Sequence, residues 1–105
     1  MLNIYTDTIA IARCAGLAAK VIAQHDGDLA RQLKRAATSV PLNVAEGSGV
    51  QGGHRRQRYL TALGSARETM ACFDIAVALE YLAPLDAVAR DRLDKVIATL
   101  VKVSR

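Results

Sequence analysis

Hydrophobic residues recur at intervals of three and four positions along most of the chain, which is the spacing of one buried face of an α-helix. A first such stretch covers residues 3–24, and its apolar stripe consists of Ile4, Ile11, Ala15, Ala18 and Ile22. The sequence HDGD then interrupts the pattern, and Asp28 is the expected N-cap of a second helix. This helix begins at Leu29, and we expect the glycine-rich sequence GSGVQGG to end it as a loop.

Two further stretches complete the pattern. A third helix is predicted over residues 54–81, with an apolar stripe of Leu60, Leu63, Met70, Phe73, Val77 and Tyr81. A fourth starts near Pro84, since proline suits a first helical turn, and its apolar positions are Leu85, Val88, Leu93, Val96, Ile97, Leu100 and Val103. Short connections favour antiparallel neighbours, so we predict one all-α domain over residues 1–105, an antiparallel up-down-up-down four-helix bundle.

The second helix contains a proline at position 41, where the helical pattern otherwise continues. Proline lacks a backbone donor and clashes with the preceding turn, so we predict that this helix is kinked near Pro41. Thr38 or Ser39 is expected to bond a backbone carbonyl that the proline leaves unpaired.

Asn43 and Glu46 follow the proline and share one face of the continued helix, because they lie three residues apart. Glu46 is the only acidic residue between positions 29 and 67, and it is placed to tie Arg35, Arg67 or backbone donors of the third helix. We interpret the pair as a structural brace, and a ligand contact and a catalytic role stay open as alternatives.

The first and third helices carry more apolar residues than the core of a four-helix bundle needs. The residues that lie outside their two stripes are Ile9, Leu17, Val21, Ala71, Ile75 and Leu79. This surplus favours an oligomer interface, and the alternative is a helix surface on which alanine is simply tolerated.

Positive charge is concentrated in the middle of the chain. The net charge is +4, but residues 29–67 hold seven basic residues against Glu46, which makes +6 there and leaves −2 elsewhere. The seven are Arg31, Lys34, Arg35, Arg55, Arg56, Arg58 and Arg67. This polarity favours phosphates of a nucleic acid as partner, with two solvated basic faces as the alternative. One group, at the start of the second helix, consists of Arg31, Lys34 and Arg35. The other, at the start of the third helix, consists of Arg55, Arg56 and Arg58, so the two groups are expected at opposite ends of an antiparallel hairpin.

The sequence offers no catalytic, metal or cofactor site. GSGVQG matches a dinucleotide-binding pattern literally, but that fingerprint requires a preceding β-strand. The acidic residues are scattered, and Ser39 and Ser48 lack histidine and acid partners, so we predict a non-catalytic protein. His25 and His54 lie far apart, and neither a metal ion nor a cofactor is expected.

We expect the chain to act in the cytoplasm and not in a membrane. The longest apolar stretch, residues 9–23, is interrupted by Arg13 and Lys20 and is too short to span a bilayer. The N-terminal sequence MLNIYTDTIA lacks the basic start of an export signal. Cys14 and Cys72 lie far apart, so reduced and packed thiols are expected.

The sequence LARQLKRAATSVPLNVAEGSG, residues 29–49, resembles the signature of four-helix bundle proteins described as rRNA intervening-sequence proteins. The positions that carry this resemblance are Gln32, Arg35, Ala36, Ala37, Ser39, Pro41, Asn43, Ala45, Glu46 and Gly47. A second match lies in residues 59–82, where Gly64, Ser65 and Glu68 fall on a Gly-Ser pair and a following glutamate of the family. We regard Ser39, Pro41, Asn43, Glu46 and Gly47 as the structural signature.

The resemblance implies a bundle that assembles into a ring, with a pentamer as the expected state. Some members are encoded within intervening sequences of large-subunit rRNA, and related accessory proteins of diversity-generating retroelements associate with nucleic acid and a reverse transcriptase through a basic ring. We therefore predict a non-catalytic homo-oligomer that binds RNA or DNA backbone, as an accessory factor of a reverse transcriptase or an rRNA-linked element. The alternative is a protein-interaction module that docks a partner through its apolar surface.

Overall fold

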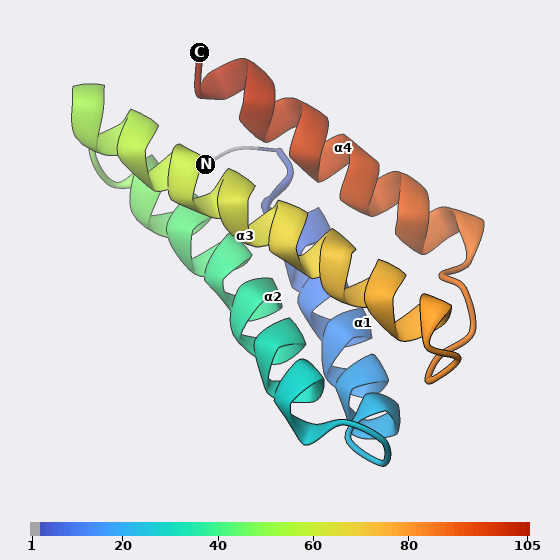
Figure 1. Ribbon diagram of the computed structural model, residues 1–105. Helices are drawn as coiled ribbons and strands as arrows, with labels where there is room; N and C mark the ends of the chain where they lie inside the picture. Colours follow the sequence, from blue (N-terminus) through green and yellow to red (C-terminus); the bar gives the residue numbers. More distant parts are fainter. Residues whose placement is uncertain (1–2) are drawn as a thin grey trace.

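The computed structural model describes residues 3–105, and in this part of the chain four helices and no strands occur. The helices are α1 (Tyr5–Ile22), α2 (Gly27–Ser48), α3 (Gly52–Ala78) and α4 (Ala87–Val103). Each helix packs against the next, and α4 returns to α1 (Figure 1). The predicted up-down-up-down four-helix bundle is therefore confirmed. None of the four helices combines the length and apolar character that a membrane span requires.

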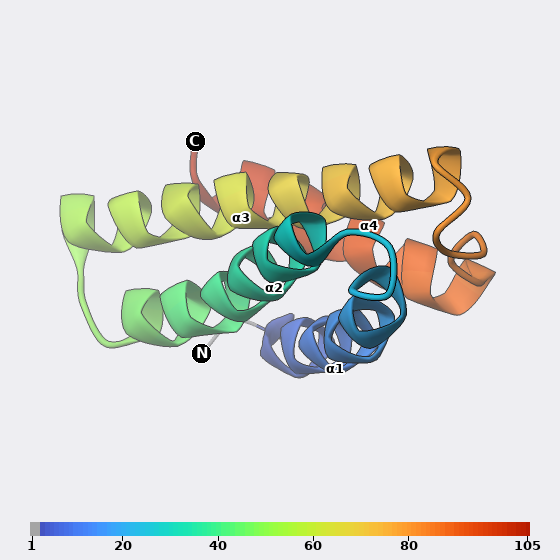
Figure 2. The same cartoon turned by 60° about the horizontal axis from the view of Figure 1, so that its bottom comes forward.

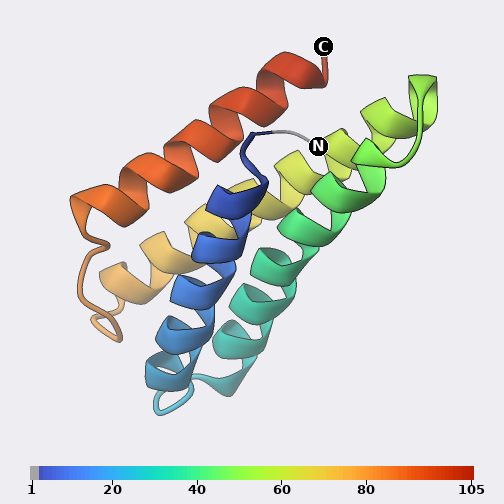
Figure 3. The same cartoon turned by 180° about the vertical axis from the view of Figure 1, so that it is seen from behind.

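The four helices form two layers. Helices α1 and α2 lie side by side in one layer, and α3 and α4 form the other (Figure 2). The hairpin of α2 and α3 extends beyond the first turn of α1, as the view from behind also shows (Figure 3). The bend between α2 and α3 therefore forms a projecting tip, and the turn between α1 and α2 lies at the opposite end of α2.

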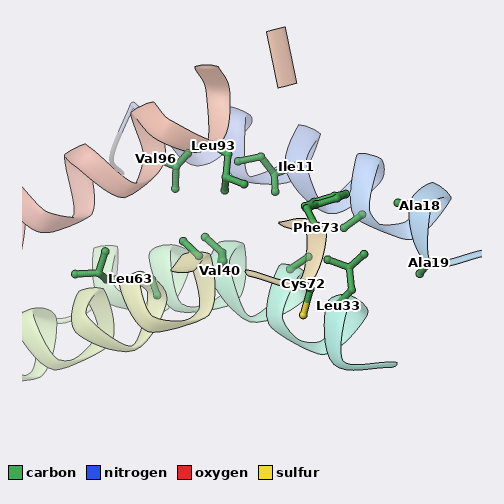
Figure 4. Packing of buried hydrophobic residues seen from close by; sticks show 14 of the residues in the cluster. Ile11, Ala18, Ala19, Leu33, Val40, Leu63, Cys72, Phe73, Leu93 and Val96 are labelled. Atoms are coloured by element: carbon green, nitrogen blue, oxygen red, sulfur yellow. The ribbon is translucent and has the colours of Figure 1, made fainter. Parts of the chain in front are cut away.

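The core is built from aliphatic side chains of all four helices, together with the rings of Phe73 and Tyr59 from α3. Figure 4 shows Ile11, Leu33, Phe73 and Leu93, each from a different helix, directed toward the shared interior. Five fully or almost fully buried alanines allow the helix backbones to approach closely: Ala15, Ala37, Ala62, Ala66 and Ala76. Most positions of the predicted stripes face this core, but Leu60 and Val77 on α3 are only partly buried and lie outside it, and Val88 in the first turn of α4 is 66% exposed.

Two helix starts differ from the sequence-based expectation. The N-cap of α2 is Asp26, whose carboxylate accepts a hydrogen bond from the Leu29 amide at 3.0 Å, and Asp28 lies within the first turn. Helix α4 starts after Asp86, which accepts from the Ala89 amide at 2.8 Å, so Pro84 belongs to the connection. In both places an aspartate cap, which satisfies the first unpaired amides, decides the boundary.

Helix α3 ends three residues earlier than predicted, at Ala78. The amide of Tyr81 donates to the carbonyl of Ala76, and that of Glu80 donates to Val77, which is the pattern of a Schellman cap. Glu80 takes the left-handed conformation that glycine usually supplies, with φ of 62°. Tyr81 then stacks on His25 of the α1–α2 turn, with ring centroids 4.9 Å apart, and so joins the two turns at this end of the bundle.

Candidate nucleic-acid interface

The signature residues around Pro41 form contacts inside the chain. Helix α2 continues through the buried proline without a break. The Asn43 amide group donates to the Ser39 carbonyl at 2.9 Å and to the Ser39 hydroxyl at 3.0 Å. The Ser65 hydroxyl in α3 donates to the Ser39 hydroxyl at 2.8 Å. These bonds connect α2 to α3 halfway along the hairpin.

The hydroxyl of Thr38 does not bond the carbonyl that the proline leaves unpaired, which belongs to Ala37. It donates to the carbonyls of Lys34 and Arg35, at 2.9 and 3.2 Å, and so bonds back into the turn before the proline. The prediction for Thr38 was therefore wrong in its acceptor, because the hydroxyl reaches only carbonyls three and four residues back.

The glycine-rich segment is mostly helical, contrary to the expected loop. Helix α2 includes Gly47, and α3 starts at Gly52, so only residues 49–51 connect them. A β-carbon at Gly47 would lie 2.4 Å from Cε1 of Tyr59, whose side chain is 5% exposed. Gly47 is therefore required for a close approach of the Tyr59 ring to α2, and not for chain flexibility.

Two of the predicted phosphate-binding arginines make contacts within the hairpin tip. The Nε–H of Arg55 donates to the carbonyls of Gly47 at 3.2 Å and Val50 at 2.8 Å, at the C-terminal end of α2 and in the connection that follows it. Arg58 forms an ion pair with Glu46 at 2.9 Å, whereas Arg35, Arg67 or a backbone donor of the third helix was the expected partner. Both arginines thus hold the start of α3 against the end of α2.

Three other predicted residues remain exposed without an ion-pair partner among residues 3–105. They are Arg35 on α2, Arg56 at the hairpin tip and Arg67 in the middle of α3. Counted along the helices at 1.5 Å per residue, Arg35 lies about 20 Å from the tip end of α2 and Arg56 lies about 6 Å from the tip end of α3, so the two residues are about 14 Å apart along the hairpin.

Arg31 and Lys34 line a groove between α1 and α2, together with Arg13 and Lys20 of α1. We refer to these four residues as the groove cations. Arg13, Lys20 and Lys34 have no ion-pair partner in the described part of the chain. Arg31 pairs with Asp28 at the surface, where both side chains are mostly exposed. Such an exposed pair contributes about 0–1 kcal/mol, so a phosphate can readily replace the carboxylate.

Arg13 and Lys20 were not among the predicted phosphate contacts, because in the sequence they only interrupt an apolar stretch. They are seven residues apart, or about two helical turns, and therefore share one face of α1. The signal was present, but it becomes meaningful only when α2 is known to lie beside that face. Both residues fall outside the segment in which positive charge is concentrated.

Large apolar side chains are exposed on both helices for which a surplus was predicted. On α1 the exposed residues are Ile9, Leu17 and Val21, and on α3 they are Ile75 and Leu79. Leu17 is 61% exposed and also lines the groove beside Arg13 and Lys20.

The two thiols are not activated. Burial raises the pKa of Cys14, an effect that Asp86 reinforces and Arg92 opposes. Burial, with a smaller contribution from Glu68, also raises the pKa of Cys72. Both cysteines are free, and no group of three or more potential metal ligands occurs within residues 3–105.

These features define an all-helical bundle whose cations lie partly in an open groove and partly in the hairpin tip. The family model for the 23S rRNA-intervening sequence protein matches residues 2–102, and the chain belongs to this family. A comparison with curated proteins gives no match. A solved structure, described as a protein of unknown function from the S23 ribosomal protein family of Bacteroides thetaiotaomicron, shares the fold. It is 16% identical with a TM-score of 0.71, and the alignment covers 96% of this chain and 91% of that chain.

Proposed function

We propose that this protein is a non-catalytic, homo-oligomeric accessory protein that binds the phosphate backbone of RNA or DNA. The observation that carries this proposal is the set of exposed cations without ion-pair partners in the described chain. Within the predicted set these are Lys34, Arg35, Arg56 and Arg67, and Arg31 joins them through its weak surface pair. Exposed lysine and arginine bind phosphate mainly by releasing counterions, so affinity falls as salt rises.

Recognition of individual bases has little support in this chain. Tyr59, the aromatic residue beside the tip arginines, is buried against Gly47 and is not available for stacking on a base. Arg55 and Arg58 are engaged inside the hairpin. Binding through the remaining cations would be directed at the backbone and largely independent of sequence.

The partners follow from the same proposal. The exposed apolar side chains of Ile75 and Leu79 on α3 support association of several copies, and a pentameric ring would bring basic groups from neighbouring chains onto one surface. The protein then acts as an accessory factor of a reverse transcriptase or of an rRNA-linked element. Two free thiols fit action in the reducing cytoplasm.

The test compares binding of a labelled RNA strand, a DNA strand and a duplex across a series of salt concentrations. We expect binding at low salt that weakens linearly on a logarithmic plot, with the oligomeric mass measured in parallel. Absence of binding at low salt, or tight binding that salt does not change, would contradict the proposal. Sustained cleavage of the probe would contradict its non-catalytic part.

The second candidate is a protein-interaction module that does not bind nucleic acid. It is favoured by the exposed large apolar side chains, which occur on all four helices, because exposed apolar patches often mark protein-interaction sites. Capture of partners from nuclease-treated extract separates the two functions. A defined protein partner retained after nuclease treatment, together with no direct binding of nucleic acid, would favour this candidate.

A further inference from the structure

The groove between α1 and α2 has one wall from each helix, and both walls carry positive charge. Arg13 and Lys20 stand on the α1 wall, and Arg31 and Lys34 stand on the α2 wall. No acidic residue lines the groove, although Asp28 reaches Arg31 from outside it. We propose that this groove binds the backbone of a single nucleic-acid strand, with the four groove cations as its phosphate contacts. The inference rests on the proposed function and assigns its binding surface.

The antiparallel arrangement places the groove cations in two pairs across the groove. Lys20 and Arg31 both lie within about 6 Å of the α1–α2 turn, counted along their helices at 1.5 Å per residue. Arg13 and Lys34 both lie further from the turn, at roughly 10–14 Å by the same count. The two levels are therefore roughly 7 Å apart. This is about twice the spacing of roughly 3.4 Å per phosphate along one strand of a DNA duplex, so it suits a strand that is more extended than in a duplex.

Small residues line the groove between its four cations, among them Gly16, Ala19 and Ala30, and we refer to them as the floor of the groove. Gly16 lies on this floor, and a β-carbon built there meets no atom of the chain within 4 Å. Glycine in a helix interior is destabilising, and no contact within the described chain requires it at this position. The open space accepts a sugar or the edge of a base, and the exposed side chain of Leu17 supplies an apolar contact beside it.

A single strand fits these features better than a duplex does. Packed helices are about 8–10 Å apart, so a groove between two of them is narrow. A single strand can lie between two rows of cations with its sugars near Gly16. A duplex, which is much wider than this helix spacing, would touch the rim of the groove and leave its floor empty.

The first test removes the positive charge from the α1 wall of the groove. The double variant Arg13→Gln/Lys20→Gln is compared with Lys102→Gln/Arg105→Gln, which removes the same charge from exposed residues at the end of α4. For a single strand we expect the groove variant to bind at least about tenfold more weakly at low salt, and its salt slope to fall by about 1.4 in magnitude. The control is expected to keep the slope of the unmodified protein.

The second test fills the floor and leaves the charge unchanged. Gly16→Gln is compared with Gly64→Gln on α3, since a side chain at either glycine meets no neighbouring atom. We expect Gly16→Gln to weaken single-strand binding about tenfold, with little effect on a duplex, whereas Gly64→Gln binds like the unmodified protein.

The outcomes separate this inference from the proposed function. If the unmodified protein binds a single strand but both groove variants bind like their controls, the groove assignment fails and the proposed function stands. A duplex that binds as tightly as the strand and is equally sensitive to Gly16→Gln also overturns the assignment, as does a change in oligomeric mass caused by Gly16→Gln. If the unmodified protein binds neither strand nor duplex at low salt, the proposed function itself fails.

Discussion

The two ends of α2 use the same residue types for different purposes. At its C-terminal end, Gly47 receives the ring of Tyr59, and Arg55 donates to backbone carbonyls. At the other end, a β-carbon at Gly16 of the adjoining α1 would meet no side chain within 4 Å, and Lys34 has no ion-pair partner within residues 3–105. The hairpin tip therefore uses its glycine and arginine for folding, while the groove leaves its own available to a ligand.

This difference shows why the number of basic residues is a poor guide to a binding surface. A guanidinium that already donates to carbonyls of its own chain must lose those bonds before it can bind a phosphate in their place. An ammonium in water exchanges only counterions. The tip and the groove can therefore be told apart by measuring stability and binding in the same variants.

The largest expected effect is that of Gly47→Ala. Its new methyl group would lie 2.4 Å from the buried Tyr59 ring, which has little room to move, and we expect a loss of about 2–3 kcal/mol in the free energy of unfolding. The matched control, Gly16→Ala, should instead gain about 0.5–1 kcal/mol, because its β-carbon meets nothing. Urea denaturation measures both. Equal effects of the two substitutions would remove the distinction between the tip and the groove.

A smaller effect is expected where the two halves of the hairpin meet. Asn43→Leu removes the donor to Ser39 and places an aliphatic group beside the Ser39 and Ser65 hydroxyls, so we expect a loss of about 1–2 kcal/mol. A double-mutant cycle with Ser65→Ala should show coupling between the two positions, since they share the Ser39 hydroxyl. Strictly additive effects would mean that this hydrogen-bond network does not brace the hairpin.

Substitutions at Arg55 and at Lys34 are expected to have opposite effects, the first on stability and the second on binding. Arg55→Gln should cost about 1 kcal/mol of stability, because two carbonyls lose a charged donor, and should change the salt slope of binding little. Lys34→Gln should leave stability within about 0.5 kcal/mol and reduce the slope by about 0.7 for a single strand. Denaturation and binding titrations on both variants check this pattern, and a larger binding defect in Arg55→Gln would reverse it.

The sequence was sufficient for the helices and their order, because a period of 3.6 residues and short connections leave few alternatives. It was insufficient at Gly47, since the Tyr59 ring that requires glycine lies twelve residues further along the chain and meets it only after the hairpin closes. Arg13 and Lys20 were overlooked for the same reason, because their charge acquires a partner wall only when α2 packs beside α1. The local pattern of a sequence does not show which exposed residues of different helices become neighbours in the fold.

Glu46→Gln combines a small expected change in stability with a test of whether the tip can be made to resemble the groove. Glu46 and Arg58 form their ion pair with about half of each side chain exposed, so Glu46→Gln should cost no more than about 0.5 kcal/mol. The same change releases the Arg58 guanidinium and removes the only negative charge from the basic segment. Binding of a single strand should therefore become tighter at low salt, with a slope steeper by up to about 0.7.

Glu68→Gln on α3 removes one negative charge without releasing Arg58, and it should raise the affinity less. Equal gains in the two variants would mean that net charge alone governs binding, and that the engagement of Arg58 within the tip does not limit it.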